Sequence, residues 1–252
     1  MIAPAPPPPD GGTALVGRER EQGLLRDALA AALAGRGGLA LVGGEAGIGK
    51  TALAEALIAE ATARGVLVLV GRGYDLTEPS PYGLWVDLFG RYLPTHDLPP
   101  HPAPFAARGL VGDVAGQGSL VQQVLDWCVA LAAIRPFVIV LDDLHWADAP
   151  SLTLLRAVAR ILPGQASLIV GTYRDDEVGR EHPLATVLPL LVREAGARRV
   201  ALRPLAPEAV HDLVAARFPL APPDAARLVA YLHARAEGNP FYLGEFLRTL
   251  EE

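Results

Sequence analysis

The fold is decided by the stretch Leu39-Ala40-Leu41-Val42-Gly43-Gly44-Glu45-Ala46-Gly47-Ile48-Gly49-Lys50-Thr51. An apolar run of strand length leads into a glycine-rich turn, then a lysine and a threonine, then a helical pattern. From Gly44 onward the residues fit G-x-x-x-x-G-K-[ST], the pattern of a phosphate-binding loop, or P-loop. Glycines allow such a loop to curl until its backbone N–H groups point at phosphate oxygens. We therefore predict an α/β protein with the P-loop NTPase fold.

The loop residues have distinct predicted roles. Lys50 is expected to contact the β- and γ-phosphates, and the Thr51 hydroxyl to bind Mg²⁺. The helix that follows adds its positive N-terminal end. A turn that only connects a strand to a helix is the alternative, which the flanking pattern disfavours. The residues predicted to bind ATP or ADP here are Gly44, Glu45, Ala46, Gly47, Ile48, Gly49, Lys50 and Thr51.

Composition limits the class of protein. A chain of 252 residues that is 51 % hydrophobic is suited to one large α/β domain, alone or with a small appendage. The net charge of −6 and the lack of a basic stripe argue against direct nucleic-acid binding. The single cysteine, Cys128, rules out an internal disulfide. No apolar run is long enough to span a membrane, so we expect a soluble, cytoplasmic protein.

The chain divides into three predicted parts. Residues 1–12 are proline-rich and are expected to form an extended tail. Residues 13–203 alternate between strand and helix patterns and form the predicted P-loop core. Residues 204–252 contain helical patterns only and are expected to form a small lid domain. Within the core, residues 66–70 are expected to be a fully buried strand, and residues 94–118 a long loop that is either functional or mobile.

Two acids end another apolar strand pattern, about 90 residues after the P-loop. Asp142 is the predicted magnesium ligand, and Asp143 is placed to orient or deprotonate the water that attacks the γ-phosphate. The alternative for this pair is a capping or surface role. We expect the apolar strand and its acids to be the second half of the phosphate site.

Arg174 ends the next apolar strand. Ligands of doubly wound sheets lie beyond the carboxyl ends of the strands, so this arginine is a candidate sensor and stabiliser of the terminal phosphate. A surface arginine paired with Asp175 or Asp176 is the alternative. His145 and Trp146 follow the acids closely, and for them a core role is as well supported as a catalytic one. The predicted catalytic residues are thus Lys50, Asp143 and Arg174.

Several segments occur together in a family-specific order. They are Val16-Gly17-Arg18-Glu19, the P-loop, Leu141-Asp142-Asp143-Leu144-His145-Trp146-Ala147-Asp148, Gly171-Thr172-Tyr173-Arg174 and Glu237-Gly238-Asn239-Pro240-Phe241. In this arrangement the chain resembles the AAA-like ATPase module of the STAND class of signal-transducing NTPases. The best match is the module at the N-terminus of large ATP-binding LuxR-type transcriptional regulators of bacteria.

The resemblance implies further expectations. Val16, Gly17 and Arg18 would line the adenine side of the nucleotide, and Pro240 would pack near the adenine from a helical lid. The mostly parallel five-stranded sheet would place the strand of Arg174 between the P-loop strand and the acidic strand. The sensor and DNA-binding regions of such regulators are absent from this sequence and would be its partners in the same protein. A nucleotide-dependent homo-oligomer is a further possible partner.

The sequence is compatible with two functions. The favoured one is an ATP/ADP-binding regulatory switch with slow, Mg²⁺-dependent hydrolysis, since no arginine can be assigned as a finger acting across subunits. The alternative is a stand-alone turnover ATPase or phosphotransferase, in which residues 94–118 would form a substrate lid. Hydrolysis far below the roughly 1–100 s⁻¹ of kinases would favour the switch.

Overall fold

The computed structural model describes residues 15–75, 80–106 and 117–251. In these residues, five strands form one sheet in the order β2-β3-β4-β1-β5. All four neighbouring pairs are parallel. The sheet is therefore wholly parallel, and β4 lies between β1 and β3, as the resemblance implied. The strands are β1 (Gly38–Gly43), β2 (Leu67–Arg72), β3 (Phe137–Asp142), β4 (Ser167–Tyr173) and β5 (Arg198–Ala201).

The central strands are buried on both faces. Every residue of β3 and β4 is buried, which accounts for their continuous apolar sequences. β2 differs from the prediction of a fully buried strand at 66–70, because it is an edge strand in which only two of six residues are buried. A run of valine and leucine is compatible with both an edge strand and a central strand of a parallel sheet. The sequence alone therefore could not show which position β2 takes.

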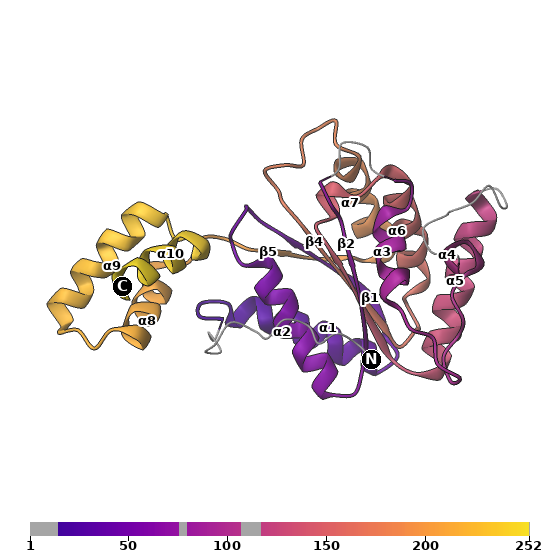
Figure 1. Ribbon diagram of the computed structural model, residues 1–252, viewed down its shortest axis with the longest axis horizontal. Helices are drawn as coiled ribbons and strands as arrows, with labels where there is room; N and C mark the ends of the chain where they lie inside the picture. Colours follow the sequence, from indigo (N-terminus) through magenta and orange to yellow (C-terminus); the bar gives the residue numbers. More distant parts are fainter. Residues whose placement is uncertain (1–14, 76–79, 107–116, 252) are drawn as a thin grey trace. The chain divides into compact units, whose positions relative to one another are not determined.

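Helices cover both faces of the sheet (Figure 1). α1 (Glu19–Leu33) and α2 (Lys50–Ala63) lie on one face, and Arg26 of α1 forms an ion pair with Glu60 of α2 at 3.1 Å. α3 (Gly83–Arg91), α5 (Gln117–Ile134), α6 (Ala149–Ile161) and α7 (Pro183–Ala195) lie on the other. The core is therefore the three-layer sandwich expected of a P-loop protein.

The expected loop at 94–118 is partly described. Its residues 107–116 lie outside the described residues, α4 (Ala103–Ala106) is a short helix, and α5 begins at Gln117. The segment before α4 is held to α3, since the His101 ring contacts the carbonyl oxygens of Phe89 and Tyr92 at 3.1 and 3.0 Å. Phe105 stacks on Phe89 with ring centroids 4.6 Å apart. Residues 101–105 of this segment thus pack against α3 and the core, whereas residues 94–97 are exposed.

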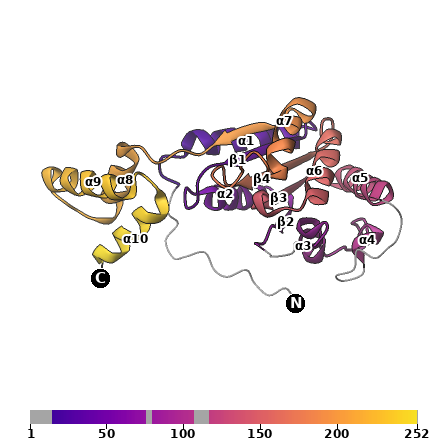
Figure 2. The ribbon, with the colours of Figure 1, turned by 90° about the horizontal axis from the view of Figure 1, so that it is seen from above.

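The contacts divide the chain into two units. Among the described residues, the core unit is Glu21–Arg203, and the C-terminal unit consists of residues 204–251 together with residues 15–20. α8 (Pro207–Arg217), α9 (Pro222–Ala236) and α10 (Pro240–Glu251) form one group of helices (Figure 2). Val210, Leu232 and Leu243 are fully buried among them. Residues 15–20 fall within the predicted core, 13–203, but their contacts group them with α8–α10. The predicted tail, residues 1–12, lies outside the described residues.

None of the helices in the described residues is long and apolar enough to cross a membrane.

Candidate functional site

The P-loop joins the end of β1 to the start of α2 in the conformation that its glycines allow. Gly49 is the residue before α2 and has φ 102°, and Gly44 has φ 154°. A Cβ on Gly44 would lie 2.9 Å from the Leu202 carbonyl oxygen and from the Ile48 side chain. Because neither backbone shape suits a residue with a side chain, these two glycines determine the course of the loop.

The other loop residues take different positions. Glu45, Ala46, Gly47 and Thr51 are exposed, whereas Ile48 is buried in the core with 1 % of its surface accessible. Ile48 can therefore bind nucleotide only through its backbone. The exposed stretch 45–47 lies just before the N-terminus of α2, where the helix dipole favours negative charge.

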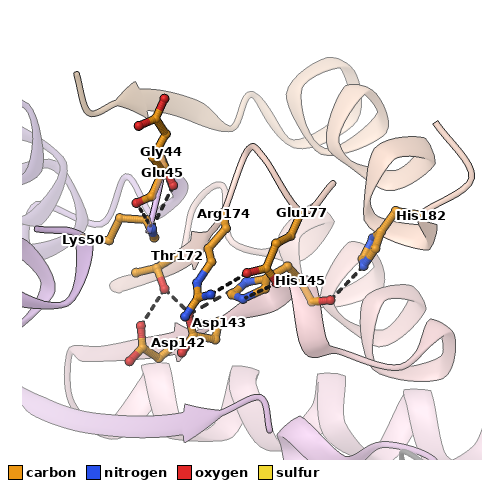
Figure 3. A network of polar contacts seen from close by, with 10 residues as sticks. All are labelled: Gly44, Glu45, Lys50, Asp142, Asp143, His145, Thr172, Arg174, Glu177 and His182. Atoms are coloured by element: carbon orange, nitrogen blue, oxygen red, sulfur yellow. Dashed lines mark hydrogen bonds and ion pairs between the residues drawn. The ribbon is translucent and has the colours of Figure 1, made fainter. Parts of the chain in front are cut away.

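Lys50 lies folded onto its own loop. Its Nζ donates hydrogen bonds to the carbonyl oxygens of Gly44 at 2.8 Å and Glu45 at 2.7 Å (Figure 3). Burial, reinforced by the nearby charge of Arg174, lowers the pKa of Lys50, while Asp143 acts in the opposite direction. The ammonium thus lies inside the P-loop, where a phosphate would replace the two carbonyl oxygens as its acceptor.

Asp142 ends β3 and is held by a residue from β4. The Thr172 hydroxyl donates to Asp142 Oδ1 at 2.5 Å and accepts from the Asp143 backbone N–H at 3.0 Å. Thr172 is fully buried. It therefore aims the Asp142 carboxylate and stabilises the turn that follows β3.

Asp143 lies in the left-handed region, with φ 60° and ψ 53°. This conformation costs an L-residue about 1 kcal/mol or more, and the hydrogen bond that the Asp143 N–H donates to the Thr172 hydroxyl offsets part of that cost. Burial and the neighbouring Asp142 raise the pKa of Asp143, while Arg174 and Lys50 lower it. A carboxylate with a raised pKa in this position is suited to accept a proton from water.

The residues fit magnesium by the chemistry of their donors. Thr51 offers a hydroxyl at the start of α2, and Asp142 offers a carboxylate with one oxygen on Thr172. Mg²⁺ prefers oxygen ligands and keeps several waters, so it needs only one or two protein groups beside a nucleotide phosphate. Thr51 and Asp142 are therefore a suitable pair of ligands.

Arg174 follows β4 directly, and its charge acts on Lys50 and Asp143. Its guanidinium lies 5.1 Å from the centre of the Trp146 ring. It also forms an ion pair with Glu177, which Figure 3 shows. In the described residues its ion-pair partner is neither Asp175 nor Asp176, which the surface alternative had named. Trp146 and Glu177 thus fix the orientation of the arginine.

His145 is buried beside these charges. Its side chain is inaccessible to solvent, and neither ring nitrogen has a hydrogen-bond partner among the described residues. Nδ1 lies 3.8 Å from Asp143 Oδ1, and Nε2 lies 3.5 Å from Glu177 Oε2. Burial lowers the pKa of His145 to about 4, so the ring is neutral at pH 7.

The residues assigned to the adenine by resemblance lie in the C-terminal unit. A Cβ on Gly17 would be 2.6 Å from Ala209 Cβ and 3.1 Å from the Leu205 side chain. Val16 packs against the same apolar cluster, and Arg18 is buried. Pro240 is the first residue of α10, and the preceding turn is joined to Leu205 by a 2.7 Å hydrogen bond from Leu205 N to Gly238 O. Gly17 and the turn before Pro240 therefore both lie against Leu205.

The core unit brings together Lys50, Asp142, Asp143 and Arg174, which the sequence had selected separately. It also adds Thr172 and Glu177, which the sequence analysis missed. Thr172 was visible only as part of the Gly171–Arg174 segment, and Glu177 as one of three acids after Arg174. Such an arrangement can bind a phosphate chain, hold a divalent cation and polarise a water molecule.

Solved structures support the fold. A Walker-type ATPase of Pyrococcus abyssi matches with a TM-score of 0.55 at 15 % identity, over 91 % of this chain and 65 % of its own. Drosophila ORC, in a structure bound to DNA, matches with a TM-score of 0.58 at 16 % identity, over 94 % and 56 %. Cdc6p from Pyrobaculum aerophilum matches with a TM-score of 0.52 at 13 % identity, over 86 % and 51 %. At these identities the likeness concerns the fold alone, and the chain spans between half and two thirds of each protein.

A search of curated protein sequences returned no match. The model of the AAA ATPase domain family matches residues 14–170, which contain the P-loop, Lys50, Asp142 and Asp143. This match covers more than half of the chain and includes both halves of the predicted phosphate site. The chain therefore belongs to the AAA ATPase domain family.

Proposed function

We propose that this protein is an ATP/ADP-binding regulatory switch with slow, Mg²⁺-dependent ATP hydrolysis. The observation that carries the proposal is the convergence of four charged side chains from three elements. Lys50 comes from α2, Asp142 and Asp143 from the end of β3, and Arg174 from the end of β4. The charge of Arg174 acts on both Lys50 and Asp143. An arginine placed this close to the P-loop can report whether a terminal phosphate is present.

Each residue has a defined task in the proposed reaction. The P-loop N–H groups and Lys50 bind the β- and γ-phosphates, and Asp143 orients water for attack on the γ-phosphorus and accepts its proton. Arg174 stabilises negative charge on the γ-phosphate. Bound Mg²⁺, held by Thr51 and Asp142, would neutralise phosphate charge. The products are ADP and inorganic phosphate.

The regulatory part of the proposal rests on the resemblance to LuxR-type regulators. We assign Val16, Gly17, Arg18 and Pro240 to the adenine on that ground. The proposal includes further partners: sensor and DNA-binding regions of the same protein, and a nucleotide-dependent homo-oligomer. A nucleotide shifts such a switch only by its difference in affinity for the two states. Arg174 supplies a group that distinguishes ATP from ADP.

Two measurements test the function. First, protein purified without added nucleotide is denatured, and the released nucleotide is identified by ion-exchange chromatography. Near-stoichiometric ADP supports a switch that releases its product slowly. Second, Lys50→Ala should abolish tight ATP binding, and Asp143→Asn should retain binding but stop hydrolysis. ATP binding unchanged by Lys50→Ala would contradict the proposed site.

The steady-state rate separates the switch from the alternative turnover enzyme. The switch should hydrolyse ATP well below the roughly 1–100 s⁻¹ of kinases, even with Mg²⁺ in excess. A rate in that range would favour a stand-alone ATPase or phosphotransferase instead.

A further inference from the structure

Glu177 is the partner that Arg174 has in this structure. Both side chains are part-exposed, 29 % for Arg174 and 37 % for Glu177, and they lie three residues apart. The stacking of Arg174 on Trp146 holds the guanidinium on one side while Glu177 binds it at the end. The N–H of Arg174 Nη1 that binds Glu177 cannot be donated to a phosphate at the same time. A bound γ-phosphate and the Glu177 carboxylate therefore compete for Arg174.

Glu177 also has a second group within reach. Its Oε2 lies 3.5 Å from His145 Nε2, while its Oε1 binds Arg174 (Figure 3). His145 is fully buried and its ring nitrogens have no hydrogen-bond partner among the described residues. A neutral imidazole with its proton on Nε2 is a donor that Glu177 can use. When Arg174 binds a phosphate instead, the Glu177 carboxylate can therefore accept a hydrogen bond from His145 Nε2.

We propose that Glu177 is a specificity-determining residue, which holds Arg174 when the terminal phosphate is absent and so limits the preference of the site for ATP over ADP. The proposal rests on the proposed function, because it takes Arg174 as the sensor of the γ-phosphate. The γ-phosphate of ATP must displace Glu177 from Arg174, whereas ADP has no γ-phosphate and leaves the ion pair in place. The ion pair thus opposes ATP binding selectively.

The test is the ratio of ATP to ADP affinity in Glu177→Gln. The glutamine keeps the size of the side chain and removes the charge that competes with phosphate. A part-exposed ion pair contributes up to about 1 kcal/mol, so ATP should bind about twofold to fivefold more tightly. ADP affinity should stay the same. Titration calorimetry with Mg²⁺ and each nucleotide on nucleotide-free protein measures both constants.

Asp176→Asn is the matched control. Asp176 is an exposed neighbour whose charge also acts on Lys50, but among the described residues it forms no ion pair with Arg174. Its removal should change ATP and ADP affinity by the same factor. A selective gain for ATP in Glu177→Gln alone therefore reports the competition for Arg174 and not a general loss of negative charge.

The Arg174→Ala variant tests the proposed sensor function separately from the role of Glu177. If Arg174→Ala lowers ATP affinity selectively while Glu177→Gln leaves the ratio unchanged, the role of Glu177 is refuted and Arg174 remains the sensor. If Arg174→Ala leaves the ratio unchanged, both are refuted. A selective loss of ATP affinity in Glu177→Gln also overturns the inference, since Glu177 would then orient Arg174 for phosphate. In the double variant the ratio should equal that of Arg174→Ala, because the two residues act on one interaction.

Discussion

Thr172→Val tests how the acidic end of β3 is held. Valine matches the shape of threonine but removes the hydroxyl that donates to Asp142 Oδ1 at 2.5 Å and accepts from Asp143 N at 3.0 Å. The Thr172 side chain is fully buried, so water cannot take the place of its hydroxyl without a cavity. A lost hydrogen bond to a charged group costs about 1.5–3 kcal/mol, and a buried N–H left unpaired costs about 1–3 kcal/mol.

We expect the free energy of unfolding of the core unit to fall by roughly 3–5 kcal/mol. Urea unfolding followed by tryptophan fluorescence measures it, because Trp85, Trp127 and Trp146 all lie in Glu21–Arg203. Thr172→Ser is the control. It keeps the hydroxyl and loses one methyl group, which costs about 1 kcal/mol.

The same variant should weaken the magnesium site. Without Thr172, the Asp142 carboxylate is no longer oriented, so the gain in ATP affinity on adding Mg²⁺ should shrink, while ATP affinity in EDTA stays close to that of the wild type. Two results would refute the reasoning. One is equal stability of the valine and serine variants, and the other is an undiminished effect of Mg²⁺ in Thr172→Val.

Two further predictions concern residues around the same site. Asp148→Ala should lower the free energy of unfolding by about 3 kcal/mol, because Asp148 accepts from Tyr82 N at 2.9 Å, Gly83 N at 3.1 Å and Ser151 N at 2.8 Å. Hydrogen exchange should accelerate at the Tyr82 and Gly83 amides, and unchanged protection there would show that α3 is held by other contacts. For His145, the pKa is about 4 in the folded protein and about 6.5 unfolded, so the unfolded chain binds the extra proton between these values and stability falls as pH drops from 6.5 to 4. Relative to His145→Gln, the wild type should lose up to about 3 kcal/mol over this range in urea titrations; parallel pH profiles of the two proteins would exclude a buried neutral ring.

The positions of most elements follow from local patterns. Asp148 is the N-cap residue of α6, and its side chain accepts from Ser151 N. Proline and glycine mark other ends, as with Pro183 at the start of α7 and Gly196 after it. These signals are readable because a cap or a turn involves residues within a few positions of one another. The P-loop can be recognised from the sequence for the same reason, because its eight residues are consecutive.

The side-chain partners of the site residues could not be predicted from such local patterns. Arg174 was selected from its place at a strand end, but its ion pair with Glu177 depends on the turn after β4. The proximity of His145 to Glu177 depends on how the turn after β3 packs against it. The first contact spans only three residues, but three acids follow Arg174 and no local signal shows which of them is its partner. The second contact joins two separate segments of the chain.

The sequence by itself determined the P-loop, the acidic strand end and the alternation of strands and helices, because backbone propensity and capping act over a few residues. The tertiary structure alone decided which strand lies at the edge and which side chains meet. In the parallel register of β3 and β4, Leu141 pairs with Gly171. The next residues along each strand, Asp142 and Thr172, are thereby brought within 2.5 Å of each other. That contact follows from strand order and register, which depend on packing across the whole sheet.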